Sequence, residues 1–314
     1  MKVGIVGTGF VGSTTAYTLV MKGLGTEIVL IDKNTARAAA EASDIRHAIP
    51  FGHSVNIRQG DYPDLAGCSA VIVAAGKSRA AGQSRLELAL ENAAIFREVI
   101  PAIIEHSPCS VLIITTNPVD IMTHVATRIA VNLDVPTGLV VGTGTALDTA
   151  RFRTLLGDFL DIDSSHVHAY VLGEHGDSEV MAWSLARVGG LSIGEVCAFL
   201  DKEFDDSLKK RINDDVRHAG RDIISGKGAT YYGIGSILAH IIDVIIHDHR
   251  AILTVSTFVH DCEGVRDVTL SLPHILGGRG IIARLPLPLD AAERSELRKS
   301  AKILRKATDA LSFS

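Results

Sequence analysis

The sequence has few cysteines, and none of the four stands in a C-x-x-C pair. Disulfide frameworks and structural zinc sites both rely on closely spaced cysteines, so this wide spacing argues against either and favours a reducing compartment. We therefore expect a cytoplasmic protein without a metal centre. The cysteines are Cys68, Cys109, Cys197 and Cys262.

Long apolar runs and blocks of basic residues are also missing. Although 46% of the residues are apolar, no run approaches the roughly 20 residues that a membrane-spanning helix needs. The net charge is −5, and no basic block offers a surface to nucleic acid or to an anionic membrane. The composition is typical of a soluble globular protein with one large or two medium domains. We expect neither a nucleic-acid nor a membrane partner.

The pattern that says most about the chain lies in its first residues. An apolar stretch over 3–6 leads into Gly7-x-Gly9-x-x-Gly12, and a helix-like stretch follows over 13–22. Gly7 permits a tight turn, Gly9 lets the backbone approach a pyrophosphate, and Gly12 lets the helix pack closely on the strand. The helix N-terminus then offers free N–H groups and a positive dipole end to phosphates.

A second apolar stretch strengthens the case for a dinucleotide site. Residues 27–31 are apolar after Glu27, and they end at Asp32, twenty residues past Gly12. A carboxylate at this position can accept hydrogen bonds from ribose hydroxyls, and its charge would repel the 2′-phosphate of NADP. We therefore expect NAD. The alternative is a glycine-rich strand–turn–helix that holds no ligand.

The first 142 residues alternate between strand-like and helix-like stretches. Several of the strand-like stretches are continuous Val, Ile, Leu and Ala runs, as expected of strands covered on both faces. Six such strands joined by crossovers imply an α/β fold with a Rossmann, doubly wound parallel sheet, and a ligand at the carboxyl ends of its strands. The expected strands cover 3–6, 27–31, 55–58, 70–75, 111–115 and 139–141, and two of the helices cover 36–48 and 84–106.

The pattern changes after residue 142, so we expect a second domain over 143–314. It mixes long helices with stretches that look antiparallel, which is typical of an α+β substrate domain. Without a repeat or a long linker, the two domains should be closely joined, with a cleft between them. The expected helices cover 147–156, 206–225, 231–247 and 290–311, and the expected strands cover 166–172, 251–259, 268–272 and 280–284.

Four short segments carry side chains suited to chemistry. One holds Asn117, the second holds Asp148 and Arg151, the third holds His175, and the fourth is a glycine-containing loop that ends at Arg85. Together with the glycine pattern they resemble the NAD-dependent lactate/malate dehydrogenase family over essentially the whole chain. The segments are 116–120, 147–153, 173–178 and 75–85, and the resemblance extends to 226–232 and 271–273.

This resemblance implies a reversible hydride transfer between NADH and C2 of a small 2-oxo acid, giving a 2-hydroxy acid. His175 would act as the acid and base, since imidazole titrates near neutrality, and Asp148 would orient and stabilise its imidazolium. Arg151 would anchor the substrate carboxylate with its planar fork, and Arg85 would polarise the ketone. Asn117 would hold the reacting oxygen near the nicotinamide. The alternatives without a catalytic role are that His175 is a surface or core histidine, and that Asp148 and Arg151 form a simple helical ion pair.

The same resemblance assigns the cofactor contacts. They come from the glycine turn, from the end of the second strand, and from the loops that follow the fourth and fifth strands. The residues are Gly7, Gly9, Phe10, Val11, Gly12, Asp32, Ala75, Gly76 and Asn117.

Two positions give opposite indications about the substrate. Arg79 matches the loop position where malate dehydrogenases carry Arg and lactate dehydrogenases carry Gln, whereas Thr230 matches the lactate-type pocket. A charge-assisted hydrogen bond is worth about 1.5–3 kcal/mol, and an unpaired guanidinium beside pyruvate would be disfavoured, so Arg79 favours an oxaloacetate/malate preference. The alternative is a lactate dehydrogenase in which Arg79 turns to solvent. The loop also carries Ala81-Gly82 where the family usually has Pro-Gly.

Family members are dimers or tetramers, and the resemblance to the lactate branch implies a homotetramer. Arg153 and His168 match positions that bind fructose 1,6-bisphosphate between subunits of allosteric bacterial lactate dehydrogenases. Two cations per subunit, doubled by a twofold axis, would suit a bisphosphate. The alternative is that both residues form local ion pairs.

Other classes of function fit less well. A non-catalytic NAD-sensing module would not need the Asp148 and His175 pair, and an NAD-dependent glycosidase would need a metal. The His247-Asp-His249 run could suggest a metal, but it is more typical of a solvated helix end. The run 260–262, which contains His260, is predicted to be a turn.

Overall fold

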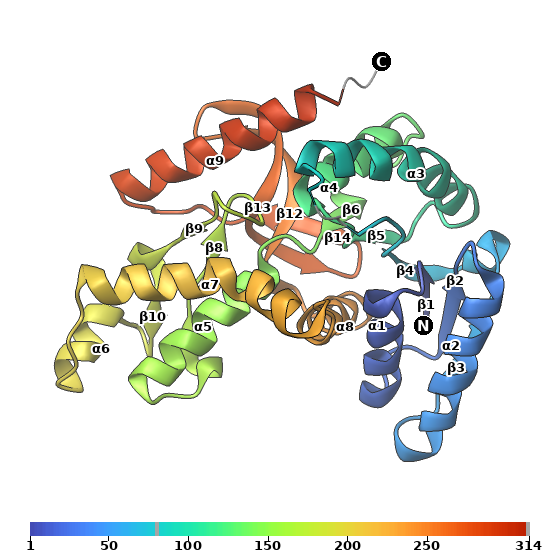
Figure 1. Ribbon diagram of the computed structural model, residues 1–314, viewed down its shortest axis with the longest axis horizontal. Helices are drawn as coiled ribbons and strands as arrows, with labels where there is room; N and C mark the ends of the chain where they lie inside the picture. The colour runs from blue at the N-terminus through green and yellow to red at the C-terminus, as the bar shows by residue number, and fades with distance from the viewer. Residues whose placement is uncertain (79–81, 312–314) are drawn as a thin grey trace.

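The computed structural model describes residues 1–78 and 82–311. Its central feature is a nine-stranded sheet whose strands run in the order β14-β13-β12-β6-β5-β4-β1-β2-β3 (Figure 1). None of the helices in the described residues is long and apolar enough to cross a membrane. All four cysteines lie in these residues and are free thiols.

Six strands of this sheet form the predicted parallel, doubly wound half. The order β3-β2-β1-β4-β5-β6 places the reversal of strand order between β1 and β4, which is where such sheets bind ligands. The predicted strands are confirmed to within two residues. The strands are β1 (Lys2–Val6), β2 (Glu27–Ile31), β3 (Asn56–Gln59), β4 (Cys68–Val73), β5 (Val111–Ile114) and β6 (Val140–Gly142).

Helices cover both faces of this half, and one of them was not named in advance from the sequence. That helix, α4, follows the predicted Asn117 segment and is buried almost throughout. The helix α3 begins where Ser84 and Glu87 form a capping box. The elements are α1 (Phe10–Lys22), α2 (Thr35–Ala48), α3 (Arg85–His106) and α4 (Val119–Val131), with short 3₁₀ turns η1 (Ile49–Phe51), η2 (Tyr62–Leu65) and η3 (Thr137–Leu139).

The antiparallel strands of the second half extend the same sheet. Ser256 in β12 pairs antiparallel with Gly142 in β6, and β12, β13 and β14 then pair in sequence. The sheet therefore runs across the expected division at 142/143, which stays a prediction. Residues 260–262, expected to be a turn, continue β12, and the turn follows at Glu263 and Gly264, both with positive φ. The strands are β12 (Ala251–Cys262), β13 (Val265–Gly277) and β14 (Gly280–Arg284).

The stretch predicted as one strand over 166–172 is two short strands in two different sheets. β7 pairs with β10, and β8 pairs with β9, because the chain breaks its extended run at Ala169 and Tyr170. This break lets the second piece lead directly into the loop that carries His175. The short elements are β7 (Val167–His168), β8 (Val171–Leu172), β9 (Val180–Met181), β10 (Arg187–Val188) and β11 (Leu191–Ser192), with η4 (Ser164–His166) and η5 (Trp183–Leu185).

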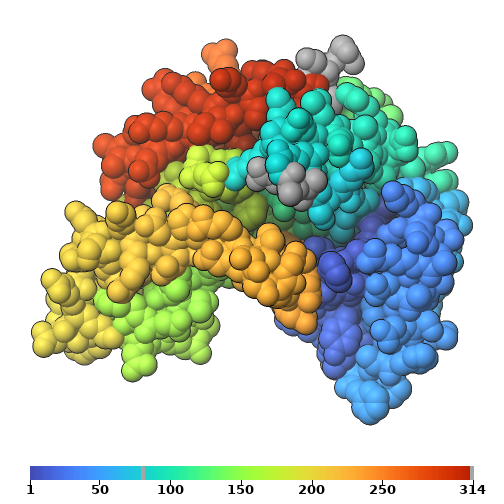
Figure 2. Space-filling model, viewed as in Figure 1, coloured from blue at the N-terminus to red at the C-terminus, as the bar shows by residue number. Residues whose placement is uncertain are grey.

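The helices of the second half pack on both sides of these strands. The predicted apolar stripe is confirmed for Leu297, Ala301 and Leu304 of α9, which are buried, while Leu311 is also buried but lies past the end of the helix. The helix α8 packs against α1 of the first half, and the space-filling view is hollowed between the α1–α2 segment and the α5–α7 segment (Figure 2). The helices are α5 (Ala146–Leu160), α6 (Ile193–Phe199), α7 (Asp206–Lys227), α8 (Tyr232–Ile246) and α9 (Ala291–Asp309).

Candidate active site

The glycine turn between β1 and α1 has the geometry that a dinucleotide requires. Gly7 has φ 100°, and a Cβ there would lie 2.5 Å from the backbone nitrogen of Ala75. A Cβ on Gly12 would lie 1.9 Å from the carbonyl oxygen of Gly7. Gly9, the residue that caps α1, differs from both, because a Cβ there would meet nothing within 4 Å. Gly7 and Gly12 thus close the turn, while Gly9 leaves open space beside the helix N-terminus for a phosphate.

Asp32 is fixed at the end of β2 beside this turn. Its carboxylate accepts hydrogen bonds from the backbone N–H of Thr8 at 2.8 Å and from that of Asn34 at 2.9 Å. Burial acts to raise the pKa of Asp32, but these backbone donors outweigh burial and hold the pKa below its ordinary value. The carboxylate is therefore charged at neutral pH, which suits ribose hydroxyls and disfavours a 2′-phosphate.

Two further loops with predicted cofactor residues meet at the same edge of the sheet. Thr116 Oγ1 donates to the carbonyl oxygen of Ala75 at 2.8 Å, and a Cβ on Gly76 would lie 2.4 Å from the Thr116 side chain. Asn92 links the two loops by donating to the carbonyl oxygen of Asn117 at 2.8 Å. The loops after β4 and β5 are thus joined beside the glycine turn. Phe10 is 64% exposed on the turn, and its ring stacks on that of Tyr231.

The two residues predicted to form an acid–base pair, His175 and Asp148, are in contact. His175 Nδ1 lies 2.5 Å from Asp148 Oδ2, and Arg151 Nη1 lies 2.8 Å from the other oxygen of the same carboxylate. The negative charge of Asp148 raises the pKa of His175 to about 9, against burial, which lowers it. Burial acts to raise the pKa of Asp148, but the charges and hydrogen bonds of His175 and Arg151 outweigh it and hold the pKa below its ordinary value. One buried carboxylate therefore orients both cations.

A second buried carboxylate, to which no role was predicted, holds the backbone of the histidine loop. Asp120 accepts from the backbone N–H of His175 at 2.7 Å and from Ser256 Oγ at 2.6 Å. Burial raises the pKa of Asp120 to about 6, against the lowering effect of these hydrogen bonds. The residue stands at the end of the quoted 116–120 segment. Its partners come from β12 and from the 173–178 loop, so no local pattern reveals them.

Arg85 reaches the histidine loop but is bound there to carboxylates. Its Nη1 lies 2.7 Å from Glu174 Oε1, and its Nη2 lies 3.0 Å from Asp177 Oδ2. Both acids neighbour His175 closely in the chain. The first residue of α3 is thus placed beside the acid–base pair, with its guanidinium paired by Glu174 and Asp177.

A third acid near the pair lacks a complete set of partners. Glu179 is 3% exposed, and its Oε1 is one of three buried polar side-chain atoms in the described residues without a hydrogen-bond partner; another is Nε of Arg217. Arg217 Nη2 instead donates to the backbone carbonyl of Glu179 at 3.0 Å. Burial, and then the charge of Asp148, raise the pKa of Glu179 to about 8. The 173–178 pattern gave no sign of this arrangement, because Arg217 comes from α7.

The remaining predicted residues lie at different places. Arg79 lies outside the described residues, and Thr230 lies between α7 and α8. Arg153 is partly buried, and its Nε donates to the carbonyl oxygen of Ala169 at 3.0 Å, next in the chain to the exposed His168. Arg153 therefore bonds to the backbone of the residue that follows His168 in the chain.

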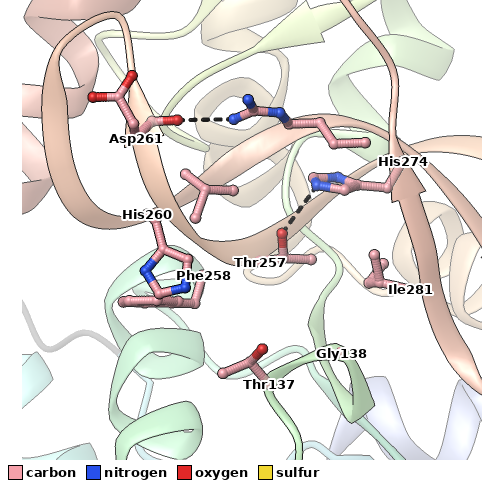
Figure 3. Close-up of a pocket in the computed structure, with 10 residues that line it drawn as sticks. Thr137, Gly138, Thr257, Phe258, His260, Asp261, His274 and Ile281 are labelled. Atoms are coloured by element: carbon pink, nitrogen blue, oxygen red, sulfur yellow. Dashed lines mark hydrogen bonds between the residues drawn. The ribbon is translucent and has the colours of Figure 1, made fainter.

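A cavity of about 420 Å³ lies elsewhere in the described residues. Figure 3 shows it between η3 and the strands β12 to β14, with Thr257 hydrogen-bonded to His274 on its wall. None of the predicted catalytic or cofactor residues lines it. The acid–base pair and the glycine turn belong to a separate region at the carboxyl ends of the parallel strands.

Comparison with known proteins agrees with this geometry. Residues 1–135 match the family described as lactate/malate dehydrogenase, NAD binding domain, and residues 145–312 match its alpha/beta C-terminal domain. The chain belongs to the lactate/malate dehydrogenase family. It is accordingly an NAD-dependent 2-hydroxy acid dehydrogenase, as the sequence analysis predicted.

Several family members are similar over their whole length. The L-lactate dehydrogenase of Geotalea daltonii is 52% identical over 311 residues, covering 99% of each chain. That of Thermus aquaticus is 50% identical over 313 residues, covering 100% of each. A solved lactate dehydrogenase from a Medee basin deep-sea metagenome library superposes with a TM-score of 0.94 at 39% identity, covering 99% of each chain. These names favour the lactate alternative over the malate preference predicted from Arg79.

Proposed function

We propose that this dehydrogenase interconverts pyruvate and L-lactate. The observation that carries the proposal is the joint orientation of His175 and Arg151 by the buried carboxylate of Asp148. A 2-oxo acid presents a carboxylate and a carbonyl oxygen two atoms apart, and this unit offers a guanidinium and an imidazolium held side by side. The relatives named L-lactate dehydrogenase support pyruvate as the acid.

When bound, NADH supplies the hydride that C2 of the substrate receives. Gly9 leaves room for its pyrophosphate, and Asp32 accepts from its ribose. Arg151 would hold the substrate carboxylate in a two-point fork and so orient the substrate for the transfer. His175 donates a proton from Nε2 to the carbonyl oxygen while Asp148 keeps Nδ1 protonated.

We assign Arg85 the stabilisation of the oxygen that becomes negative. It must first leave Glu174 and Asp177, which hold it at 2.7 and 3.0 Å. Asn117 then completes the contacts of the reacting oxygen. Because these residues belong to loops that border the same sheet edge, binding of substrate can bring them together without movement of the sheet.

The protonated state of His175 favours the reduction of the 2-oxo acid at neutral pH. The charge of Asp148 raises the pKa of His175 to about 9, so the imidazole carries its proton before the substrate binds. Reduction consumes this proton, whereas oxidation of the alcohol requires the neutral imidazole. We therefore expect pyruvate reduction to proceed without a prior protonation step.

A second candidate is the oxaloacetate/malate pair, which Arg79 favours. An arginine facing the substrate's C3 group would pair with the second carboxylate of oxaloacetate but with nothing on pyruvate. Thr230 and the lactate-type body of the chain favour the smaller acid. The two candidates differ in substrate and share every catalytic residue.

The experiment that decides is a comparison of kcat/KM for pyruvate and oxaloacetate with NADH, in the native protein and in Arg79→Gln. A lactate dehydrogenase prefers pyruvate, and the substitution changes that ratio little. If oxaloacetate is the better substrate and Arg79→Gln reverses the preference, by about 10- to 150-fold for one charge-assisted hydrogen bond, the second candidate is correct.

We also propose a homotetramer with a sugar-bisphosphate site at Arg153 and His168, and a cytoplasmic location. Arg153 Nε donates to the carbonyl oxygen of Ala169, the residue that follows the exposed His168, and this bond supports a site formed by the two residues. Fructose 1,6-bisphosphate should then lower KM for the 2-oxo acid and raise the tetramer fraction. An unchanged KM and an unchanged tetramer fraction in sedimentation would count against this site.

A further inference from the structure

A group of three side chains at the C-terminal end of α8 has the composition of a transition-metal site. Asp243, His247 and His249 each offer one potential ligand atom, and these atoms lie within 4.8 Å of one another. His247 Nδ1 is 2.7 Å from Asp243 Oδ1, and His249 Nδ1 is 3.9 Å from Asp243 Oδ2. The two imidazole rings stack with centroids 5.3 Å apart. No part of the dehydrogenase reaction accounts for this group.

The chain reversal at the helix end explains why the three residues meet. The backbone N–H of His249 donates to the carbonyl oxygen of Val244 at 3.0 Å, and that of Asp248 donates to Ile245. With Asp248 at φ 49°, these two bonds form a Schellman motif. Asp243 and His247 are already neighbours one turn apart on the helix, and the reversal folds His249 back beside them.

The reversal is itself held in place from outside the helix. Asp248 Oδ1 accepts from the backbone N–H of Gly278 at 2.8 Å, in the turn between β13 and β14. The backbone positions of His247 and His249 are therefore set before any ion binds. Little conformational entropy remains to be lost beyond side-chain rotation.

The donor set favours one class of ion. Imidazole nitrogen suits zinc, nickel, copper and cobalt, whereas magnesium and calcium prefer oxygen donors. Bond lengths near 2.1 Å place two ligand atoms of a tetrahedral zinc ion roughly 3.4 Å apart. Rotation of the imidazole rings that moves their nitrogen atoms by about 1 Å therefore brings the three side chains close to that spacing. The helix C-terminus adds a negative dipole end.

We propose that Asp243, His247 and His249 bind a divalent transition-metal ion of the zinc class, with water in the fourth position. The side chains are 31%, 52% and 50% exposed, so the ion can enter from solvent. The site is separate from the reaction centre. Tyr231 stacks on Phe10 at the start of α8, and the 15-residue helix carries the metal site about 22 Å away at its other end.

Calorimetric titration of the untagged, EDTA-treated full-length chain with ZnCl₂ tests the proposal. We expect one ion per chain, with His247→Ala and His249→Ala each weakening binding by about tenfold or more, since losing even an outer-shell partner costs 10- to 100-fold. Titration with CoCl₂ should give visible absorption bands that both variants lose. Circular dichroism of each variant checks that it has folded.

The chain supplies two matched controls. His260 lies 3.4 Å from Asp267 as an exposed pair that belongs to no three-ligand group in the described residues, so His260→Ala should bind zinc as the native protein does. Cys109→Ser removes the exposed thiol and should likewise leave binding unchanged. If the native chain binds no zinc, or if folded His247→Ala and His249→Ala bind it as tightly as the native chain, the proposal is wrong.

Discussion

At the scale of single residues, one carboxylate contacts two of the proposed catalytic residues. Asp148 is 2% exposed and uses one oxygen for His175 and the other for Arg151. A buried charge of this kind is tolerated because both oxygens are paired with cations. In the proposed mechanism, the positions of the proton donor His175 and of the carboxylate anchor Arg151 are therefore coupled through one side chain.

Replacing Asp148 should move the pH dependence of the reaction. The charge of Asp148 is the largest cause that raises the pKa of His175 to about 9, and burial alone would lower it. The native kcat/KM for pyruvate reduction should therefore fall above about pH 9, when His175 loses its proton. In Asp148→Asn the fall should begin at lower pH, and the plateau should drop by about 10² or more. Initial rates from pH 5.5 to 10 measure both.

His175→Gln is the control for this shift, since it should remove the same ionisation from the profile. A profile of Asp148→Asn that superimposes on that of the native enzyme would show that Asp148 does not set the charge of His175.

Arg151→Lys tests the geometry of the carboxylate anchor at constant charge. Lysine keeps a cation beside Asp148 but loses the planar fork that can bind a carboxylate at two points. We expect kcat/KM for pyruvate to fall by about 10- to 150-fold, the value of one charge-assisted hydrogen bond, while the dissociation constant of NADH stays unchanged. Steady-state kinetics and NADH fluorescence titration separate the two. A parallel loss of NADH affinity would place Arg151 outside the substrate subsite.

At the scale of elements, the turn from β1 to α1 contains one glycine that close packing requires and another that leaves room for the proposed pyrophosphate. Gly12 is needed because the helix and the strand turn are in contact there, whereas Gly9 faces open space. The same sequence pattern therefore contains residues under different physical constraints. Substitution by alanine distinguishes them.

Gly12→Ala should lower stability, because its Cβ would lie 1.9 Å from the carbonyl oxygen of Gly7 and the backbone must shift, at a cost of about 1–3 kcal/mol or more. Gly9 has φ −67°, which alanine can adopt, and a Cβ there would meet nothing within 4 Å, so the unliganded Gly9→Ala protein should keep its melting temperature. Its methyl group should instead weaken NADH binding by about tenfold or more. Thermal unfolding and NADH titration of both variants measure this. Equal NADH affinity in Gly9→Ala and the native protein would contradict the proposed pyrophosphate position.

At the scale of the whole molecule, the two halves share one sheet and one buried cluster of charges. Asp120 follows β5 and holds the loop that carries His175, while Arg217 in α7 contacts the backbone of Glu179. These contacts join segments more than 30 residues apart in sequence. Protonation of the cluster should therefore affect the stability of the entire fold.

Glu179 provides the test. Burial is the largest cause that raises its pKa to about 8, from an ordinary value of 4.5. A raised folded-state pKa contributes stability that is fully present below the unfolded pKa and is lost as the pH rises through the folded pKa. The native protein should therefore lose this contribution between about pH 4.5 and 8, and Glu179→Gln should not. Urea unfolding at pH 5 and pH 8 should show the variant gaining relative stability at the higher pH. A pH-independent difference would contradict the raised pKa.

The sequence by itself determined the parallel half of the fold, the cofactor and the family. Buried parallel strands are continuous apolar runs, and a glycine turn has local requirements, so both are visible in neighbouring residues. The pairing of Asp148 with His175 was also predicted, because the resemblance rests on residues in the right order. Arg79, on which the malate preference rested, is a single position, and one side chain carries less information than four matching segments.

The tertiary structure decided what depends on distant segments. The extension of the parallel sheet by β12 to β14, the support of His175 by Asp120 and the burial of Glu179 all join residues from separate elements. The grouping of His249 with Asp243 and His247 likewise requires the chain reversal after α8, which a turn at Gly278 holds. The periodicity of apolar residues shows which face of an element is buried but not which residues pack against it. The pKa of a buried charged group depends on those packing neighbours.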